Sequence, residues 1–161
     1  MKLRDAETQL DLAAAHSDSE ETVRSCINSM ISAARSVTLV MQKESGACPA
    51  LADWYHDRMS TLTSSPASEL LRFFNDQRVY SIHKGVVVPE KITPVILEFK
   101  LNNVVQPPGQ TMIFYRFAGT DEFLTRGSGG VFRLCIEYLS VLRGLVAEWL
   151  AKRAELLPSG L

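Results

Sequence analysis

The sequence predicts a mainly α-helical fold, an antiparallel four- to five-helix bundle with an inserted β-hairpin. Two observations lead to this fold class. Apolar residues recur every three or four positions over most of the chain, and this period changes to two between about residues 86 and 120. Amphipathic helices joined by short connections bury their apolar stripes against one another, which favours a bundle. The length of 161 residues is typical of one domain, so we expect residues 1–161 to form a single helical-bundle domain.

The first three helices are expected from local patterns. Residues 1–16 are rich in strong helix formers and predict a first amphipathic helix. Ser17, followed three residues later by Glu20, matches a capping box that would begin a long second helix, about Ser19 to Lys43. The apolar stripe of that helix consists of Val23, Ile27, Met30, Ala34, Val37 and Met41. After the break at "ESGACP", a third helix is expected from about Pro49 to Ser60.

The second half of the chain predicts two helices around the hairpin. A fourth helix follows the Ser/Pro-rich start of residues 62–85 and stops at Gly85. The strands of the hairpin insertion, placed at about residues 86–120, are expected near 95–101 and 111–117, where strand formers are frequent. The helical period then returns in a long closing helix over residues 129–156. This helix has apolar residues on more than one face, and so it predicts a homodimer.

Composition excludes several classes of function. The chain has 17 basic and 18 acidic residues, so no global field attracts nucleic acid or a membrane. The three cysteines Cys26, Cys48 and Cys135 form no C-x-x-C pair, which argues against a disulfide framework or a zinc site. The longest stretch without a charge, residues 101–115, contains Asn-Asn and Pro-Pro-Gly and cannot form a spanning helix. With no signal peptide, a soluble cytoplasmic protein without membrane contact is expected.

Three other patterns are expected to carry no chemistry. The glycines of "TRGSGG" precede the closing helix without the lysine of a P-loop, and a simple loop is the favoured interpretation. In "DWYHD" we expect a solvated helix face with a buried Trp54, because no repeated Glu-x-x-His pattern suggests a metal. For a small-ligand site between helices, the sequence identifies no convergent polar residues. No cofactor and no metal are expected.

The stretch "RVYSIHKG", residues 78–85, is the candidate for chemistry. It can be an ordinary helix end, since His83 and Lys84 complement the negative end of the helix dipole and Gly85 can terminate the helix. Alternatively, Arg78 and His83 are catalytic groups. Five residues advance a helix by about 500°, which leaves these two side chains about 140° apart around one helix axis. Two helices would therefore have to contribute to one cleft.

The R-x-x-x-x-H motif formed by Arg78 and His83 late in a helix resembles that of the HEPN superfamily. Many members of this superfamily of helical bundles are metal-independent RNases that work as dimers. Val79 departs from the commonest motif, in which a polar residue follows the arginine. The segments "SAARSVTLVMQKE", "DWYHDRM" and "LLRFFNDQR" are also similar to small bacterial proteins of this general type with no assigned function.

The resemblance implies an endoribonuclease or RNA-binding component of a toxin-antitoxin or phage-defence system. Histidine has a pKa suited to proton transfer, so His83 would act as the general acid, and Arg78 would hold the phosphate with its planar fork. Residues expected to contact the substrate are Arg72, Tyr80, Ser81 and Lys84. The alternative is a non-catalytic protein-interaction bundle that offers its inserted hairpin to a protein partner.

Overall fold

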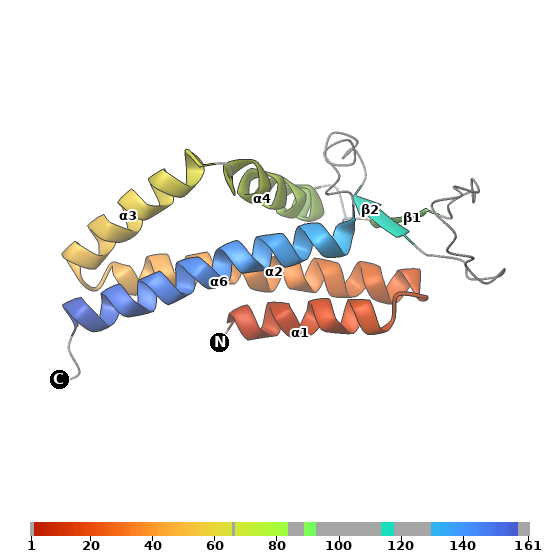
Figure 1. The fold of residues 1–161 in the computed structure, drawn as a ribbon, viewed down its shortest axis with the longest axis horizontal. Coiled ribbons are helices and arrows are strands. Elements are labelled where there is room, and N and C mark those ends of the chain that lie inside the picture. Colours follow the sequence, from red (N-terminus) through yellow and green to blue (C-terminus); the bar gives the residue numbers. More distant parts are fainter. Residues whose placement is uncertain (1, 66, 84–88, 93–113, 118–129, 158–161) are drawn as a thin grey trace, which may run out of the picture.

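The computed structural model describes residues 2–65, 67–83, 89–92, 114–117 and 130–157, and this part of the chain is mainly α-helical, as predicted. Its helices are α1 (Lys2–Ala15), α2 (Glu20–Ser45), α3 (Pro49–Thr63), α4 (Ala67–His83) and α6 (Val131–Leu156). Two short strands, β1 (Pro89–Ile92) and β2 (Phe114–Phe117), lie between α4 and α6 along the chain (Figure 1). None of the described helices is both long enough and apolar enough to cross a membrane.

The two longest helices, α2 and α6, lie side by side and run in the same direction (Figure 1). At one end, the indole Nε1 of Trp149 in α6 donates a hydrogen bond to Oγ of Ser45, the last residue of α2, at 2.9 Å. At the other end, Tyr115 of β2 contacts Ser17 before α2 and the ring of Phe132 in α6. The helix α1 packs against α2 and α6, while α3 and α4 follow each other along the other side of this pair (Figure 1).

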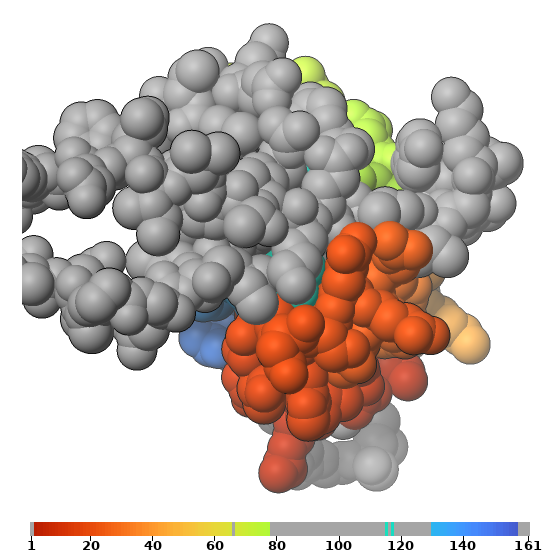
Figure 2. All heavy atoms as spheres, turned by 90° about the vertical axis from the view of Figure 1, so that its right-hand side faces the viewer, coloured from red at the N-terminus to blue at the C-terminus, as the bar shows by residue number. Residues whose placement is uncertain are grey.

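The start of α2 differs from the predicted capping box. Ser19, with φ −98° and ψ 102°, is the N-cap, and its Oγ accepts a hydrogen bond from the backbone N–H of Thr22 at 3.3 Å. Glu20 is therefore the first helical residue, and the Ser17–Glu20 interpretation is wrong. The carbonyl of Ser17 instead accepts a hydrogen bond from the hydroxyl of Tyr115 at 2.6 Å. Figure 2 looks onto this end of the molecule, where the connection between α1 and α2 lies at the surface with part of β2 beside it.

The break between α2 and α3 lies where the sequence places it. Gly46 follows α2, Cys48 is the N-cap of α3, and Pro49 is the first residue of α3, where its missing N–H costs nothing. Both helices extend two or three residues further than expected, to Ser45 and Thr63. The closing helix begins at Val131, directly after the glycine-rich segment.

The core forms around α6, because α1, α2, α3, α4 and β2 all pack against it. The apolar surplus of this helix, which motivated the predicted homodimer, is mostly covered within the chain: Leu134, Tyr138 and Leu145 are buried. The large apolar side chains of α6 that stay exposed are Ile136 and Leu150, at 59% and 43%. The whole predicted stripe of α2 is also buried, namely Val23, Ile27, Met30, Ala34, Val37 and Met41.

Aromatic rings fix α4 and β2 to α6. Phe74 of α4 stacks on Tyr138 of α6 with ring centroids 4.2 Å apart and an interplanar angle of 10°. Phe117 of β2 meets the edge of Phe74 at 5.9 Å, and both phenylalanines are fully buried. Edge-to-face and offset-stacked aromatic pairs add about 0.5–1.5 kcal/mol each beyond the area they bury. The first half of α4 is thereby held in the core.

The two strands pair in antiparallel register, with Pro89 opposite Phe117 and Ile92 opposite Phe114. The strand β2 falls inside the predicted strand at 111–117. The predicted partner strand at 95–101 lies outside the described residues, so the extent of the hairpin stays a prediction.

In α3, the predicted burial of Trp54 is wrong in part. Trp54 is only half-buried, whereas its neighbour Tyr55 is buried and donates a hydrogen bond from its hydroxyl to the carbonyl of Thr38 at 3.1 Å. Asp53, His56 and Asp57 are exposed, as expected for a solvated face. The available acceptor in α2 decides which of the two adjacent aromatic residues turns inward.

Candidate functional site

The predicted motif lies in the last two turns of α4. This helix continues to His83, so the positions of Arg78, Tyr80, Ser81 and His83 are helical. The structure does not describe the side chains of these four residues, and Lys84 lies outside the described residues. Their convergence on an RNA phosphate therefore stays a prediction. Of the predicted substrate contacts, Arg72 is described, and it is exposed on α4.

Two neighbouring cavities lie between the helices on the side where α3 and α4 cover α2 and α6. The first, of about 390 Å³, lies between α2 and α3, and the second, of about 270 Å³, lies between α2, α3, α4 and α6. Arg35, Thr38 and Met59 line both cavities, which therefore adjoin at these residues. We call the combined space the Arg35 pocket. Its further polar lining includes Gln42, Ser45, Tyr55, His56, Thr63, Ser68, Arg72, Asn75 and Tyr138.

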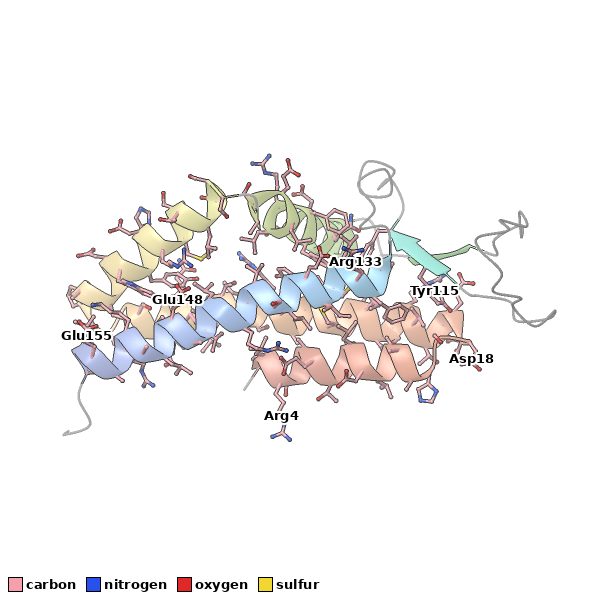
Figure 3. The ribbon with its side chains drawn as sticks, viewed as in Figure 1. Arg4, Asp18, Tyr115, Arg133, Glu148 and Glu155 are labelled. Atoms are coloured by element: carbon pink, nitrogen blue, oxygen red, sulfur yellow. The ribbon has the colours of Figure 1, made fainter. Side chains whose placement is uncertain are left out.

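Arg35 is the central group of this pocket. It is half-buried, its Nη1 donates a weak hydrogen bond of 3.3 Å to Oγ1 of Thr38, and its buried Nε has no hydrogen-bond partner. Within the described part of the chain, Arg35 forms no ion pair. Several other described cations are paired: Arg58 of α3, for example, binds Glu148 of α6, which is labelled in Figure 3, through two nitrogens. Arg35 is thus an uncompensated positive charge at the centre of a cavity.

Two phenols line the Arg35 pocket, Tyr55 in the first cavity and Tyr138 in the second. Burial raises the pKa of Tyr55 above its ordinary value, and burial raises the pKa of Tyr138 from 10.0 to about 12. The positive charge of Arg35 lowers the pKa of both residues, but burial has the larger effect. Both hydroxyls are therefore protonated at neutral pH, and that of Tyr55 already donates to the carbonyl of Thr38.

The described residues that line the pocket carry charge of one sign. Arg35 and Arg72 line it, and no aspartate or glutamate is among the described residues that do so. Such side chains can bind an anion.

Other groups of the described residues do not form a site. No cluster of three or more histidine, cysteine or acidic side chains could hold a metal ion in the described ranges. Cys26 and Cys135 are buried, and burial raises the pKa of the Cys135 thiol, which keeps it protonated and unreactive. Of the "TRGSGG" segment, only Gly130 is described, as the N-cap of α6.

The sequence identified no convergent polar residues between the helices, but Arg35, Thr38 and Tyr55 line one cavity there. A signal was present in the sequence: Arg35, Thr38, Gln42 and Ser45 repeat every three or four residues along α2. They form a polar stripe beside the buried apolar one. The residues that complete the pocket come from α3, α4 and α6, and no sequence spacing connects them with this stripe.

Comparisons of the chain with models of protein families, with curated proteins and with solved structures find no match.

Proposed function

We propose that the protein is a HEPN-like helical bundle that binds RNA at the C-terminal end of α4 and cleaves it without a metal ion. One observation carries the proposal: α4 continues without a break to His83, so Arg78 and His83 lie in its last two turns. The motif has this position in the superfamily that the sequence resembles. The exposed Arg72 adds support, because eleven residues make about three turns and place positions 72 and 83 on one side of the helix.

In the proposed mechanism, the 2′-hydroxyl of a ribose loses its proton to solvent water and attacks the adjacent phosphorus, and the bond from phosphorus to the 5′-oxygen breaks. His83 donates a proton to that leaving oxygen, and the negative end of the α4 dipole favours the protonated imidazole. Arg78 binds two phosphate oxygens and neutralises their charge in the transition state. Tyr80, Ser81 and Lys84 contact the substrate, and no cofactor takes part.

A homodimer completes this proposed site. On one helix, positions 78 and 83 point about 140° apart, so a single α4 does not direct both side chains at one phosphate. A two-fold axis would bring the motif of a second chain to the same cleft. The proposal therefore requires a dimer mass in sedimentation equilibrium at the concentration of the RNase assay. We place the protein in the cytoplasm, in a toxin-antitoxin or defence system.

The test uses purified protein and single-stranded RNA in excess EDTA. His83→Ala should abolish cleavage, because loss of a general acid typically costs about 10²- to 10⁴-fold in rate. Arg78→Lys should also be strongly impaired, since lysine keeps the charge but loses the two-pronged contact. His16→Ala, at an exposed histidine that follows α1, is the matched control and should cleave like the wild type. The products should carry 2′,3′-cyclic phosphate ends. Wild-type protein that cleaves no faster than His83→Ala over a varied RNA set would end this proposal.

The second candidate function is a non-catalytic interaction bundle that uses its inserted hairpin. The observation that favours it is the anchoring of β2: Tyr115 and Phe117 are buried, and the Tyr115 hydroxyl reaches the turn between α1 and α2, close to Asp18 (Figure 3). A hairpin fixed in this way can present its far end to another protein. Replacing residues 96–110 by a short Gly-Ser turn should preserve helicity and thermal stability but abolish a native complex seen by size-exclusion chromatography of cell extract. An unchanged elution profile contradicts this function.

A further inference from the structure

We infer that the Arg35 pocket is a binding site for a small organic anion, with its carboxylate or phosphate group on Arg35 and its apolar part against Met59 and Leu142. This site does not depend on the RNA-cleaving function proposed above. It uses described side chains of four helices, whereas the proposed RNase chemistry uses Arg78 and His83 at the end of α4. Arg72 belongs to both, since it lines the second cavity and is also a predicted RNA contact.

The charge of the pocket selects an anion. Arg35 and Arg72 both line the second cavity, and no carboxylate is among its described lining residues. Charges interact more strongly in a partly buried site than in bulk water, because the surrounding dielectric constant is lower. The planar guanidinium fork of an arginine matches two oxygens of a carboxylate or phosphate group.

The guanidinium group of Arg35 is where such an anion would bind. Its Nη1 makes one weak hydrogen bond of 3.3 Å to Thr38, so other N–H donors of the fork are left for a ligand. Its Nε also has no hydrogen-bond partner, but this atom is buried and does not face the cavity. Arg24, also in α2, provides a comparison within the same helix. Its Nε is likewise buried and unpartnered, but its Nη2 pairs with Glu20 at 3.3 Å, and it lines neither cavity. Arg35 differs from Arg24 in two respects: it lines both cavities, and it has no acidic partner among the described residues.

The rest of the lining defines the body of the ligand. Met59, Leu71 and Leu142 provide apolar wall, while Asn75 and Ser68 add polar groups of α4. Cavities of about 390 and 270 Å³ accommodate a molecule of one ring or a short chain, not a polymer. An anion with an apolar body of this size satisfies both parts of the pocket, whereas inorganic phosphate satisfies only the charged part.

The test is a titration of the full chain with benzoate, phenyl phosphate, inorganic phosphate and the neutral analogue benzamide, at constant ionic strength. Calorimetry gives the affinity, and the NMR resonance of the Arg35 Nε–H group reports where the ligand binds. We expect benzoate or phenyl phosphate to bind at one site per chain and to shift this resonance, with benzamide at least tenfold weaker. Which of the two binds more tightly distinguishes a carboxylate from a phosphate ligand.

Three substitutions locate the site. Arg35→Met keeps most of the aliphatic stem and removes the charge, and it should weaken binding at least tenfold. Arg24→Met is the matched control and should bind like the wild type. Arg35→Lys keeps the charge without the fork, and its intermediate affinity provides a second measurement if Arg35→Met does not fold.

The inference is overturned if no probe binds at millimolar concentration, if benzamide binds as well as benzoate, or if all three variants bind alike. His83→Ala should leave the affinity unchanged, so failure of the RNase proposal is distinguishable from failure of this one.

Discussion

The hydrogen bond between Trp149 and Ser45 gives a sharp prediction of stability. The two side chains are 5% and 1% exposed, and the indole Nε1 donates to Oγ of Ser45 at 2.9 Å. Ser45→Ala leaves the indole N–H without this acceptor. An unsatisfied buried donor costs about 1–3 kcal/mol. The better helix propensity of alanine returns about 0.5 kcal/mol.

We therefore expect Ser45→Ala to lower the free energy of unfolding by about 0.5–2.5 kcal/mol. For a chain of this length each kcal/mol corresponds to about 2–4 °C, so the melting temperature should fall by about 1–10 °C. The assay is urea denaturation followed by circular dichroism, with tryptophan fluorescence as a second probe. Coincident transitions would justify a two-state analysis.

Ser36→Ala is the matched control. Ser36 is also in α2, but its hydroxyl donates to the carbonyl of Ser32 at an exposed position. Its removal should change the free energy of unfolding by less than about 0.5 kcal/mol. A double-mutant cycle with Trp149→Phe separates the pair from the other contacts of each residue, and a positive coupling of about 1 kcal/mol is expected. If Ser45→Ala is as stable as Ser36→Ala, this hydrogen bond does not connect the ends of α2 and α6 energetically.

Two further predictions concern buried titratable groups. Burial raises the pKa of Tyr138 from 10.0 to about 12, so its contribution to stability is complete below pH 10 and is lost as the pH rises to 12. Tyr138→Phe should flatten the fall of unfolding free energy in urea melts between pH 10 and 12, whereas an unchanged slope would assign that fall to other groups. Of the three cysteines, Cys26 and Cys135 are buried and Cys48 is half-buried. A thiol reagent should therefore add one label to the native protein and three in urea, and fast labelling of Cys135 in the native state would contradict its burial.

Local periodicity was sufficient to predict the helices. In α2, Val23, Ile27 and Met30 recur at the spacing of one helix face, and all three are buried as this pattern requires. Such a pattern depends only on neighbours along the chain. The break after Ser45 was readable for the same reason, because Gly46 and Pro49 act on the backbone directly.

Contacts between distant segments were not readable from the sequence. Ser17 and Ser19 are both plausible N-caps, and a hydrogen bond from Tyr115, 98 residues further on, occupies the carbonyl of Ser17. Similarly, either of the adjacent residues Trp54 and Tyr55 could be buried. In the structure Tyr55 is buried, and its hydroxyl donates a hydrogen bond to the carbonyl of Thr38 in α2. In both places the structure has a hydrogen bond to a distant segment that local sequence patterns do not indicate.

The Arg35 pocket and the proposed RNase site share α4 but need not influence each other strongly. Leu71 lines the pocket, and position 78 lies seven residues later, which places both on nearly the same helix face about 10 Å apart along the axis. The Debye length at physiological ionic strength is about 8 Å, so salt weakens the part of the interaction that passes through solvent between the pocket and the end of α4. Its effect on RNA binding should therefore be a small, salt-dependent repulsion. Any stronger coupling, in either direction, would have to pass through a shift of α4 itself, and the stacking of Phe74 on Tyr138 opposes such a shift. Saturating anion should accordingly leave RNA affinity within a few-fold at physiological salt, and a tenfold change would show that α4 moves when the pocket is filled.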